Sequence, residues 1–425
     1  MDLQRGRPRR DASRERRPRR GRDPEPRQDL PRPVPQADSA RRPNGPRCRG
    51  DVVVSNPHEL RGFAVSSRGP LGKAPTVEKP ASAEELARRL HEAASSKLGV
   101  VPVGGGRASG MGDPAERCDV LLHTTRLDRV IEHSQADMVV SVEAGITLEA
   151  LQAELAKAGQ FLPLDPFNSP GHTIGGLLAT GWTGPLRLRY GSPRDFLIGI
   201  RVALPDGRLA TGGGRVVKNV SGYDMMKLHY GALGSLGVIV AASFKVFPKP
   251  LHDVTVSSAG GWADAERALV TPIAPSALEL FSDGRVLARY TGSPDAISRV
   301  VKDLGWQQTD EVAWKEHASR APERWARIAV PRERLREVVA DLGEWWASPG
   351  AGIAYWSISS DAASVKVTRA KAESLGGSLV MLAAPDDFMR EAGAWGAPPS
   401  TLELQQRLKN AFDPDHVLNP GRFVV

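Results

Sequence analysis

The apolar residues of this chain first become regular near residue 75. Leu86, Leu90 and Ala93 recur at the spacing of one helix face. Ser82 stands three residues before Glu85, a capping box that predicts where this helix begins. Short apolar runs then predict strands at 99–103, 120–122 and 138–143.

A second helix and a hairpin follow. Thr147 is a helix-capping residue, and Leu148, Leu151 and Leu155 lie on one face before Gly159 ends the helix. Apolar runs at 198–204 and 208–211 flank a Pro-Asp-Gly turn, which predicts a hairpin. The run 238–247 predicts a last strand before two prolines close this part of the chain.

The composition changes at residues 248–250, which predicts a domain boundary. Beyond it, strands are predicted at 277–281, 285–290 and 327–330, between amphipathic helices such as 331–342. Near the end, Ser400 and Glu403 form a second capping box. Leu404, Leu408 and Phe412 then line the predicted inner face of a helix.

Charge is concentrated in the first 50 residues, which hold 16 Arg against 7 Asp and Glu and also contain 9 Pro. The net charge is +8 for the chain and +9 for this segment, so residues 51–425 carry −1. Such a composition predicts a disordered basic tail. Three interpretations remain open: a tether to nucleic acid or another anionic surface, a solvated tail without a specific role, or a true start near 52–54 at a non-ATG codon.

The remaining composition, 40% hydrophobic and 25% charged, is typical of a globular protein. No run approaches the roughly 18 apolar residues of a membrane span, and no signal peptide is recognisable. The two cysteines, Cys48 and Cys118, are too few for an iron–sulfur cluster, which needs about four thiolates. The expected location is the cytoplasm, with membrane association only through partners.

Three glycine-rich clusters carry the candidate chemistry. Residues 101–110, VPVGGGRASG, place consecutive glycines after a strand, where backbone N–H groups can converge on a pyrophosphate. The loop lacks the spacing of a Rossmann fingerprint and the Lys of a Walker A loop. Residues 169–184, SPGHTIGGLLATGWTG, are small enough to lie against a planar ligand, and residues 218–224, KNVSGYD, lead into GALGSLGVI at 231–239.

Together with the terminal AFDP and LNPGR at 411–414 and 418–422, these clusters resemble the FAD-binding PCMH-type (vanillyl-alcohol-oxidase-like) flavoprotein family. Within it, KNVSGYD and Gly184-Pro185-Leu186-Arg187 most resemble the FAD-binding subunit of glycolate oxidase. The resemblance implies an α+β fold. A two-subdomain PCMH-type FAD-binding domain (75–250) is followed by an α/β cap domain (251–399). A C-terminal segment (400–425) returns to the flavin, and the tail (1–50) stays disordered.

The resemblance also implies which residues hold FAD. In the family, the glycine loop binds the pyrophosphate, the second cluster borders the pyrophosphate and flavin, and the C-terminal Asn approaches the flavin ring. The cofactor-binding residues expected on this basis are Gly104, Gly105, Gly106, Arg107, Ala108, Ser109, Pro170, Gly171, Thr173, Ile174, Gly175, Gly176, Thr180, Trp182, Thr183, Gly184, Val238, Ile239 and Asn419.

Departures from the family refine the expected function. Arg107 stands where some members carry a His covalently attached to FAD, so non-covalent FAD is expected. Leu233 replaces an acidic residue. The cap lacks the His-rich stretch of catalytic relatives, and the only histidines after residue 251 are His252, His317 and His416. No catalytic residue and no metal ligand is therefore assigned.

These features predict a subunit of a complex that oxidises glycolate, a 2-hydroxy acid, to glyoxylate. The expected partners are a homologous flavoprotein subunit, on which the substrate is oxidised, and an iron–sulfur subunit. Two alternatives remain: a self-sufficient FAD-dependent dehydrogenase or oxidase of another hydroxy acid, sugar or lactone, and a nucleic-acid-binding protein acting through its Arg-rich arm.

Several side chains keep two interpretations. His172 either acts in catalysis or fixes its loop, and Lys218 either faces phosphate or flavin or bonds to the following turn. Trp182 either stacks near the flavin or packs its loop. Tyr223 is expected to be a packed aromatic residue, and Trp345, Trp346 and Trp356 are expected in the core or a subunit interface.

Overall fold

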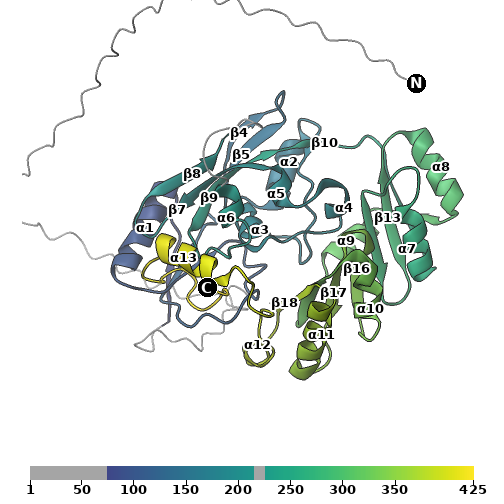
Figure 1. Cartoon of the computed structure of the whole chain (residues 1–425). Helices are drawn as coiled ribbons and strands as arrows, with labels where there is room; N and C mark the ends of the chain where they lie inside the picture. The colour runs from purple at the N-terminus through teal and green to yellow at the C-terminus, as the bar shows by residue number, and fades with distance from the viewer. Residues whose placement is uncertain (1–73, 215–224) are drawn as a thin grey trace, which may run out of the picture. The chain divides into compact units, whose positions relative to one another are not determined.

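The computed structural model describes residues 74–214 and 225–425 (Figure 1). The predicted tail, Cys48 and the KNVSGYD cluster lie outside these ranges. The described residues form mixed helix and sheet, as the sequence predicts.

A small parallel sheet opens the fold, in the order β1-β3-β2 (Thr76–Glu78, Val120–His123 and Val100–Val103). Helix α1 (Ala83–Ser95) packs on it with Leu86 and Leu90 fully buried, as predicted. The Ser82 side chain accepts from the Glu85 N–H, and the Glu85 carboxylate accepts from the N–H of Ala81. The predicted capping residues therefore do begin this helix.

A five-stranded antiparallel sheet lies next in the chain, in the order β4-β5-β9-β7-β8. Its strands are Val130–Ser134, Val139–Glu143, Val238–Lys245, Leu197–Ala203 and Leu209–Gly213. The predicted hairpin is β7–β8. The predicted last strand is divided, because β9 ends at Lys245 and β10 (Phe247–Pro248) pairs instead with β6 (Gln160–Phe161).

Short helices accompany the five-stranded sheet. They are α2 (Leu148–Ala156), α3 (Ile174–Thr180), α4 (Arg187–Tyr190), α5 (Pro193–Phe196) and α6 (Met225–His229). Helices α3 and α6 contact strands of this sheet, α2 contacts β6, and α4 contacts the sheet formed after residue 250. Thr147 caps α2 through its side chain, and Leu148, Leu151 and Leu155 are buried, as the pattern predicts.

The residues after 250 build an eight-stranded antiparallel sheet, in the order β14-β11-β13-β12-β16-β17-β15-β18. In chain order its strands are β11 (Asp253–Ser258), β12 (Ala277–Phe281), β13 (Val286–Thr291), β14 (Gln307–Thr309), β15 (Trp325–Ala329), β16 (Trp345–Ser348), β17 (Ile353–Ser357) and β18 (Ser378–Ala383). The associated helices are α7 (Gly261–Leu269), α8 (Pro294–Leu304), α9 (Val312–Ala318), η2 (Arg332–Arg334), α10 (Leu335–Val339), η3 (Pro349–Ala351), α11 (Ala362–Ser374) and α12 (Asp386–Ala392). The predicted helix 331–342 is shorter than expected, a 3-10 turn followed by α10.

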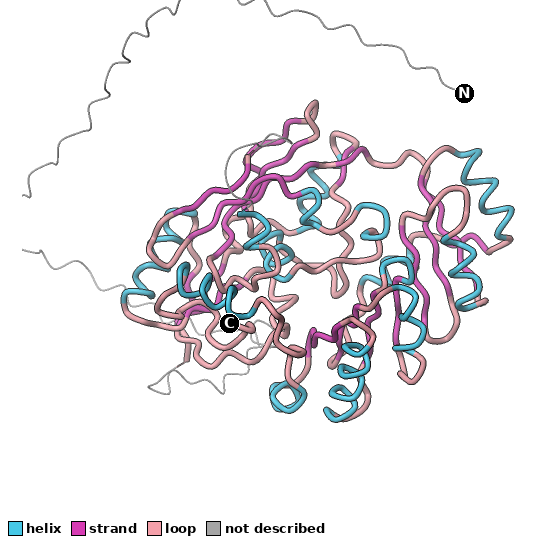
Figure 2. Tube along the Cα trace, in the orientation of Figure 1, coloured by secondary structure: helices cyan, strands magenta, loops and turns pink. Residues whose placement is uncertain are grey.

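Alternation along these strands separates two cores. Trp345 and Trp356 pack with helices α7, α8, α10, α11 and α12, seen as cyan coils in Figure 2. Their neighbours Trp346 and Tyr355 point to the opposite face and join the core that contains Phe167 and Trp182. Of the two positions expected for the cap tryptophans, the core or a subunit interface, the structure shows the core.

The last helix, α13 (Leu402–Phe412), departs from its prediction. Ser400 does not cap it; the cap residue is Thr401, without a side-chain cap bond. Leu404 is 48% exposed, and the buried residue of this helix is Lys409. The predicted inner face is wrong for Leu404 but confirmed for Phe412, which packs half-buried against the core that contains Phe167. The buried Lys409 forms an ion pair with Asp413 that also fixes the helix. Figure 1 shows α13 in yellow beside the first elements of the chain.

Candidate functional site

The glycine loop after β2 lies directly against the start of α3. The backbone N–H of Gly105 donates to Thr173 Oγ1 over 3.4 Å, and the same oxygen accepts from Gly176 N at 3.3 Å. A Cβ at Gly104 would overlap the Thr173 hydroxyl, and one at Gly105 would overlap the Gly171 carbonyl oxygen. The first two glycine clusters therefore converge, with no room for side chains at the contact.

The C-terminal segment closes the same place from another side. Leu418 forms a parallel bridge with Val100, and the N–H of Asn419 donates to the Val100 carbonyl at 2.9 Å. The Asn419 amide nitrogen donates to the Leu233 carbonyl, whereas its buried Oδ1 has no partner in the described part of the chain. An acceptor is thus left beside the glycine loop.

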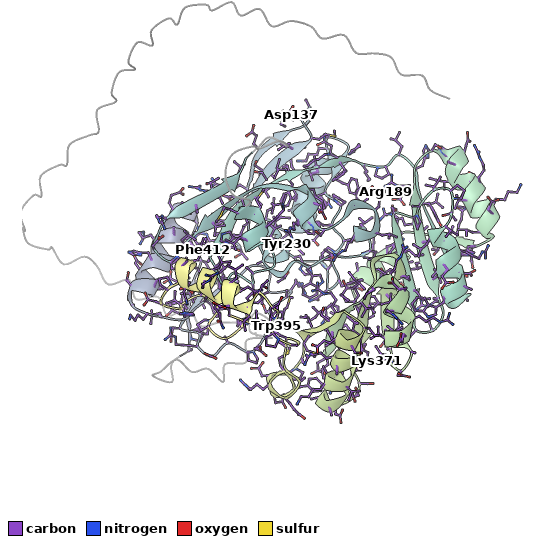
Figure 3. The ribbon with its side chains drawn as sticks, in the orientation of Figure 1. Asp137, Arg189, Tyr230, Lys371, Trp395 and Phe412 are labelled. Carbon is purple, nitrogen blue, oxygen red and sulfur yellow. The ribbon has the colours of Figure 1, made fainter. Side chains whose placement is uncertain are left out.

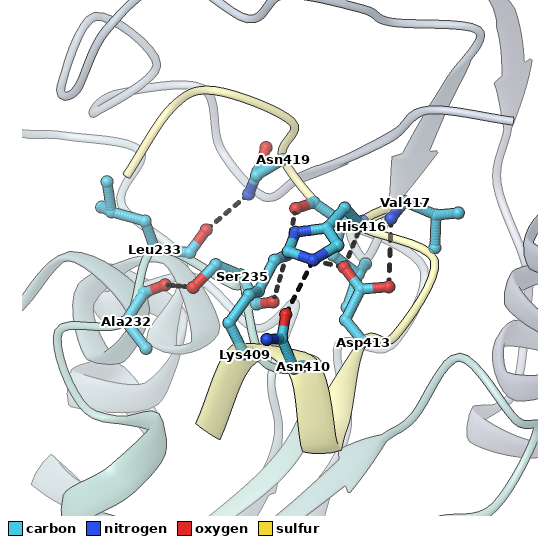
Figure 4. A network of polar contacts seen from close by, with 10 residues as sticks. Ala232, Leu233, Ser235, Lys409, Asn410, Asp413, His416, Val417 and Asn419 are labelled. Atoms are coloured by element: carbon cyan, nitrogen blue, oxygen red, sulfur yellow. Dashed lines mark hydrogen bonds and ion pairs between the residues drawn. The ribbon is translucent and has the colours of Figure 1, made fainter. Parts of the chain in front are cut away.

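A buried ion pair fixes this segment (Figure 4). Lys409 Nζ donates to Asp413 Oδ2 at 2.6 Å and to the carbonyls of Ser235 and Leu418 at 2.9 Å each. The Asp413 carboxylate also accepts from the N–H groups of Val417 and Leu418. Lys409 therefore joins helix α13, the turn before β9 and the C-terminal segment that carries Asn419.

Arg422 ties the chain end to the glycine loop itself. Its guanidinium donates to the backbone carbonyls of Ser109 and Met111. Burial lowers the pKa of Arg422 to about 10, so the side chain remains charged at neutral pH. The motif that ends in Arg422 was noted in the sequence, but its contact with the glycine loop required the fold.

These contacts enclose a cavity at the carboxyl end of β2. Its lining contains ten of the expected cofactor residues: Gly104, Gly105, Gly106, Arg107, Ala108, Ser109, Thr173, Gly176, Thr180 and Asn419. The remaining lining residues are Val101, Pro102, Val103, Met111, His172, Ala179, Leu233 and Arg422.

The other nine expected residues lie around the cavity rather than on its wall. Three of them, Ile174, Val238 and Ile239, are buried in apolar cores, and Gly175 packs on Ala144. Thr183, Gly184 and Trp182 are buried beyond α3, Pro170 is exposed, and Gly171 contacts the Arg107 side chain. Trp182 lines a second, smaller pocket that shares Met111 and Thr180 with the cavity.

His172 is the histidine on the cavity wall. Its Nε2 bonds to the Phe167 carbonyl at 2.7 Å, which requires that nitrogen to carry the proton. Burial lowers the pKa of His172 from 6.5 to about 4, so the ring is neutral at physiological pH. This contact fits the interpretation in which His172 fixes its loop.

Two tyrosine hydroxyls donate hydrogen bonds to the loop behind the cavity. Tyr230, labelled in Figure 3, donates its hydroxyl to the Gly181 carbonyl at 3.3 Å. Tyr355 donates to the Thr183 carbonyl at 3.3 Å. Burial raises the pKa of Tyr355 to about 12, so its hydroxyl stays protonated. No signal in the sequence indicates that Tyr355, in the eight-stranded sheet, contacts this loop.

The residues that line the cavity are of the kinds that bind FAD. The glycine loop offers backbone N–H groups that no Cβ shields, as a pyrophosphate requires. Buried Asn419 Oδ1 and Trp182 Nε1 are polar atoms without a protein partner among the described residues. Nowhere in 74–214 or 225–425 do three or more His, Cys, Asp or Glu side chains form a metal site.

Comparison with known proteins agrees with this geometry. Residues 74–213 match the family described as FAD binding domain. Glycolate oxidase subunit GlcE of Escherichia coli (strain K12) is 27% identical over 352 residues, covering 80% of this chain and 96% of GlcE. Glycolate oxidase subunit GlcD of Bacillus subtilis (strain 168) is 34% identical over 41% of this chain. Mitochondrial D-lactate dehydrogenase [cytochrome] of Arabidopsis thaliana is 36% identical over 41%.

The extent of these matches differs. The chain spans only 37% of GlcD and 30% of the Arabidopsis dehydrogenase. Among solved structures, an alkyldihydroxyacetonephosphate synthase superposes with a TM-score of 0.63 at 17% identity, covering 81% of this chain and 76% of the synthase. That likeness supports the fold alone. In the part of the chain that the structure describes, no helix is long and apolar enough to span a membrane.

The family match, the relatives and the convergent glycine loops agree on the cofactor. Residues 74–213 form a PCMH-type FAD-binding domain, and the chain is similar over most of its length to glycolate oxidase subunit GlcE.

Proposed function

We propose that this chain is the FAD-binding subunit of a glycolate oxidase-type complex that oxidises glycolate, a 2-hydroxy acid, to glyoxylate. The observation that carries the proposal is the convergence of the glycine loop, α3 and Asn419 on one cavity. The similarity to GlcE over 96% of that subunit supports the choice of reaction.

In this proposal the chain's own residues bind and orient the cofactor. Backbone N–H groups of Gly104–Ser109 would hold the pyrophosphate, and Thr173 and Thr180, which line the same cavity, would border the pyrophosphate and the flavin. Asn419 Oδ1 accepts from the flavin end. The bound FAD supplies a hydride acceptor. Arg107 stands where a covalent His is found in some relatives, which favours non-covalent attachment.

The same residues favour oxidation of the substrate on a partner. Deprotonating the hydroxyl group of a 2-hydroxy acid requires a base within hydrogen-bond distance. His172 donates its Nε2–H to Phe167, and burial lowers the pKa of its ring to about 4, which makes Nδ1 a weak base; His317 is buried against Glu279 at 3.1 Å. We therefore assign substrate oxidation to a homologous flavoprotein subunit and onward electron transfer to an iron–sulfur subunit.

The first test is the visible spectrum of the purified full chain. We expect flavin absorption in a 1:1 ratio to protein, and complete release of FAD on denaturation. A colourless protein that takes up no added FAD would refute the proposal. Flavin that stays on the denatured chain would refute non-covalent attachment.

The second test separates a subunit from a self-sufficient enzyme. Glycolate oxidation with an artificial electron acceptor is measured for the FAD-loaded chain alone and after adding candidate flavoprotein and iron–sulfur partners. We expect little turnover alone and turnover with partners. Bleaching of the flavin by glycolate, lactate or a sugar without any partner would instead establish the self-sufficient dehydrogenase.

A further inference from the structure

One peptide group of the glycine loop is held from outside the cofactor cavity. The side chain of Asn168, in the loop before α3, donates from its amide nitrogen to the backbone carbonyl of Arg107 at 2.7 Å. The two residues are 61 positions apart in the chain. Arg107 lines the cavity and Asn168 does not, so the bond reaches the glycine loop from its outer side.

This bond fixes the direction of the next N–H group. The carbonyl of Arg107 and the N–H of Ala108 belong to one planar trans peptide, in which the two groups point in opposite directions. Because the carbonyl faces Asn168, the N–H of Ala108 faces away from it, and Ala108 lines the cavity. Among the described residues this N–H has no acceptor. A fixed N–H group without a protein partner suits an anionic oxygen.

Other contacts of the glycine loop do not replace this bond. The N–H of Gly105 donates to Thr173 Oγ1, and the N–H of Ser109 donates to the Gly106 carbonyl at 3.4 Å. Neither contact involves the peptide between residues 107 and 108. Within 74–214 and 225–425, the amide of Asn168 is the group that bonds to this peptide.

The cap domain holds Asn168 in place. The backbone N–H of Asn168 donates to the Arg320 carbonyl, and that of Ser169 donates to the Ala318 carbonyl, each over 3.1 Å. Ala318 ends α9, which is labelled in Figure 1, and Arg320 lies just after it. Carbonyls at the end of a helix have no partner within the helix and are free to accept. The cap therefore fixes the backbone from which the Asn168 side chain reaches the glycine loop.

Phe167 anchors the residue before Asn168. Its side chain is fully buried, and its ring centroid lies 4.8 Å from that of His317, 4.7 Å from Tyr355 and 5.6 Å from Trp346. All three rings belong to the cap and meet Phe167 edge to face, a favourable arrangement. Packing and backbone bonds thus join this loop to the same domain.

The residue type at position 168 suits this role. Asn168 has a φ of +57°, a left-handed conformation that Asn adopts more readily than most residues with a side chain. Aspartate tolerates the same conformation, but an ionised carboxylate only accepts hydrogen bonds. Glycine also tolerates it and has no side chain. Substitutions can therefore change the bond to Arg107 while keeping the backbone.

We propose that Asn168 is a positioning residue for cofactor binding: held by the cap, it orients the peptide between Arg107 and Ala108 so that the N–H of Ala108 faces the pyrophosphate of FAD. The inference rests on the proposed function in one respect, since FAD must occupy the cavity. It adds that the cap contributes to cofactor affinity, whichever subunit oxidises the substrate.

The test compares the FAD affinity of the full chain with that of two variants, from flavin fluorescence when FAD is added to cofactor-free protein. Asn168→Gly keeps the backbone conformation and removes the hydrogen bond. Its FAD Kd should rise about twofold to tenfold, the usual effect of one such bond. Asn168→Asp places an acceptor against the Arg107 carbonyl and a negative charge near the pyrophosphate. Its FAD Kd at pH 7.5 should therefore rise more than that of Asn168→Gly.

A pH series distinguishes positioning from a general weakening of the fold. A protonated carboxyl group carries one O–H donor, which can restore a bond to the Arg107 carbonyl. Lowering the pH from 7.5 to 5 should reduce the ratio of the Asn168→Asp Kd to the wild-type Kd. The corresponding ratio for Asn168→Gly should not change with pH.

Controls separate folding from binding. Gln308→Glu, the same exchange of amide for carboxylate at an exposed position of the cap, is the matched control and should bind FAD as wild type does. Urea unfolding of the cofactor-free chains shows whether each variant is folded. If Asn168→Asp is not folded, Asn168→Gly, whose glycine favours this φ, carries the test.

The outcomes are distinguishable. A wild-type chain that binds no FAD refutes the proposed function, and this inference with it. A wild-type chain that binds FAD with the same Kd as Asn168→Gly and Asn168→Asp refutes only this inference. An equal rise of the Kd in both variants, with the same pH dependence, shows a structural role for Asn168 and also overturns the proposal.

Discussion

Replacing Lys409 with methionine removes the cation from the buried network behind the cofactor cavity. Lys409 is 3% exposed and Asp413 is fully buried. The substitution keeps most of the side-chain volume. It deletes three hydrogen bonds, and the Asp413 carboxylate keeps only the N–H groups of Val417 and Leu418.

The expected loss of stability follows from this geometry. Breaking a buried ion pair by removing one partner costs about 3–5 kcal/mol, because the other charge stays in a poorly hydrated place. The free energy of unfolding of Lys409→Met should therefore fall by about that amount. The FAD affinity should fall with it, since Lys409 also bonds to Leu418, next to Asn419.

A double variant tests the mechanism. Asp413→Asn removes the charge and keeps one oxygen, which can accept from only one of the two backbone N–H groups, because Val417 and Leu418 bond to different carboxylate oxygens. The combination Lys409→Met with Asp413→Asn should thus be about 2 kcal/mol more stable than Lys409→Met alone, within the range of measured coupling energies.

The measurement is urea unfolding of the full chain, with FAD affinity from fluorescence. The matched control is Lys371→Met on α11, labelled in Figure 3, whose ion pair with Asp341 at 2.8 Å lies at the surface. An exposed pair contributes at most about 1 kcal/mol. If Lys409→Met and Lys371→Met cost the same, our account of the network is wrong.

Three further outcomes are expected. Gly105→Ala should abolish FAD binding, because the new Cβ overlaps the Gly171 carbonyl oxygen. The control Gly343→Ala, with open space around it, should keep normal FAD absorbance. An intact flavin spectrum in Gly105→Ala would contradict this expectation. Burial lowers the pKa of His229 from 6.5 to about 4, so the unfolded chain binds the proton first as the pH falls. Stability should decline between pH 6.5 and 4 and decline less in His229→Phe, measured by thermal unfolding across that range; identical pH slopes would exclude His229 as a cause. Burial raises the pKa of the Cys118 thiol to about 11, so this thiol stays protonated at pH 8. Alkylation at pH 8, followed by peptide mass spectrometry, should detect modified Cys118 only after denaturation. Rapid modification of Cys118 in the native chain would contradict its burial.

Local signals predicted much of the first domain. The Ser82–Glu85 pair and the periodic leucines located α1 because capping and amphipathic spacing act within a few residues. The glycine loop was recognised for the same reason. Its contact with Thr173 spans 68 residues, and only the family resemblance implied it.

Long-range pairing explains what the sequence could not provide. From the sequence alone, a lysine at position 409 indicates a solvated helix face. Only the folded chain shows that Asp413 and two backbone carbonyls surround it. Arg327 and Tyr355 both line the smaller pocket, and their pairing depends on the register of β15 and β17. That register carries no local signature, so the pocket beside the cofactor cavity could not be predicted from the sequence.

The bond from Arg422 to Ser109 joins residues 313 positions apart. On the ribosome, the glycine loop emerges long before Leu418 exists to pair with Val100. A nascent chain can therefore build its early helices and strands but lacks the wall that Asn419 and Arg422 provide. Cofactor loading becomes a step that follows translation, and a prematurely terminated chain is left without a flavin that could react with oxygen.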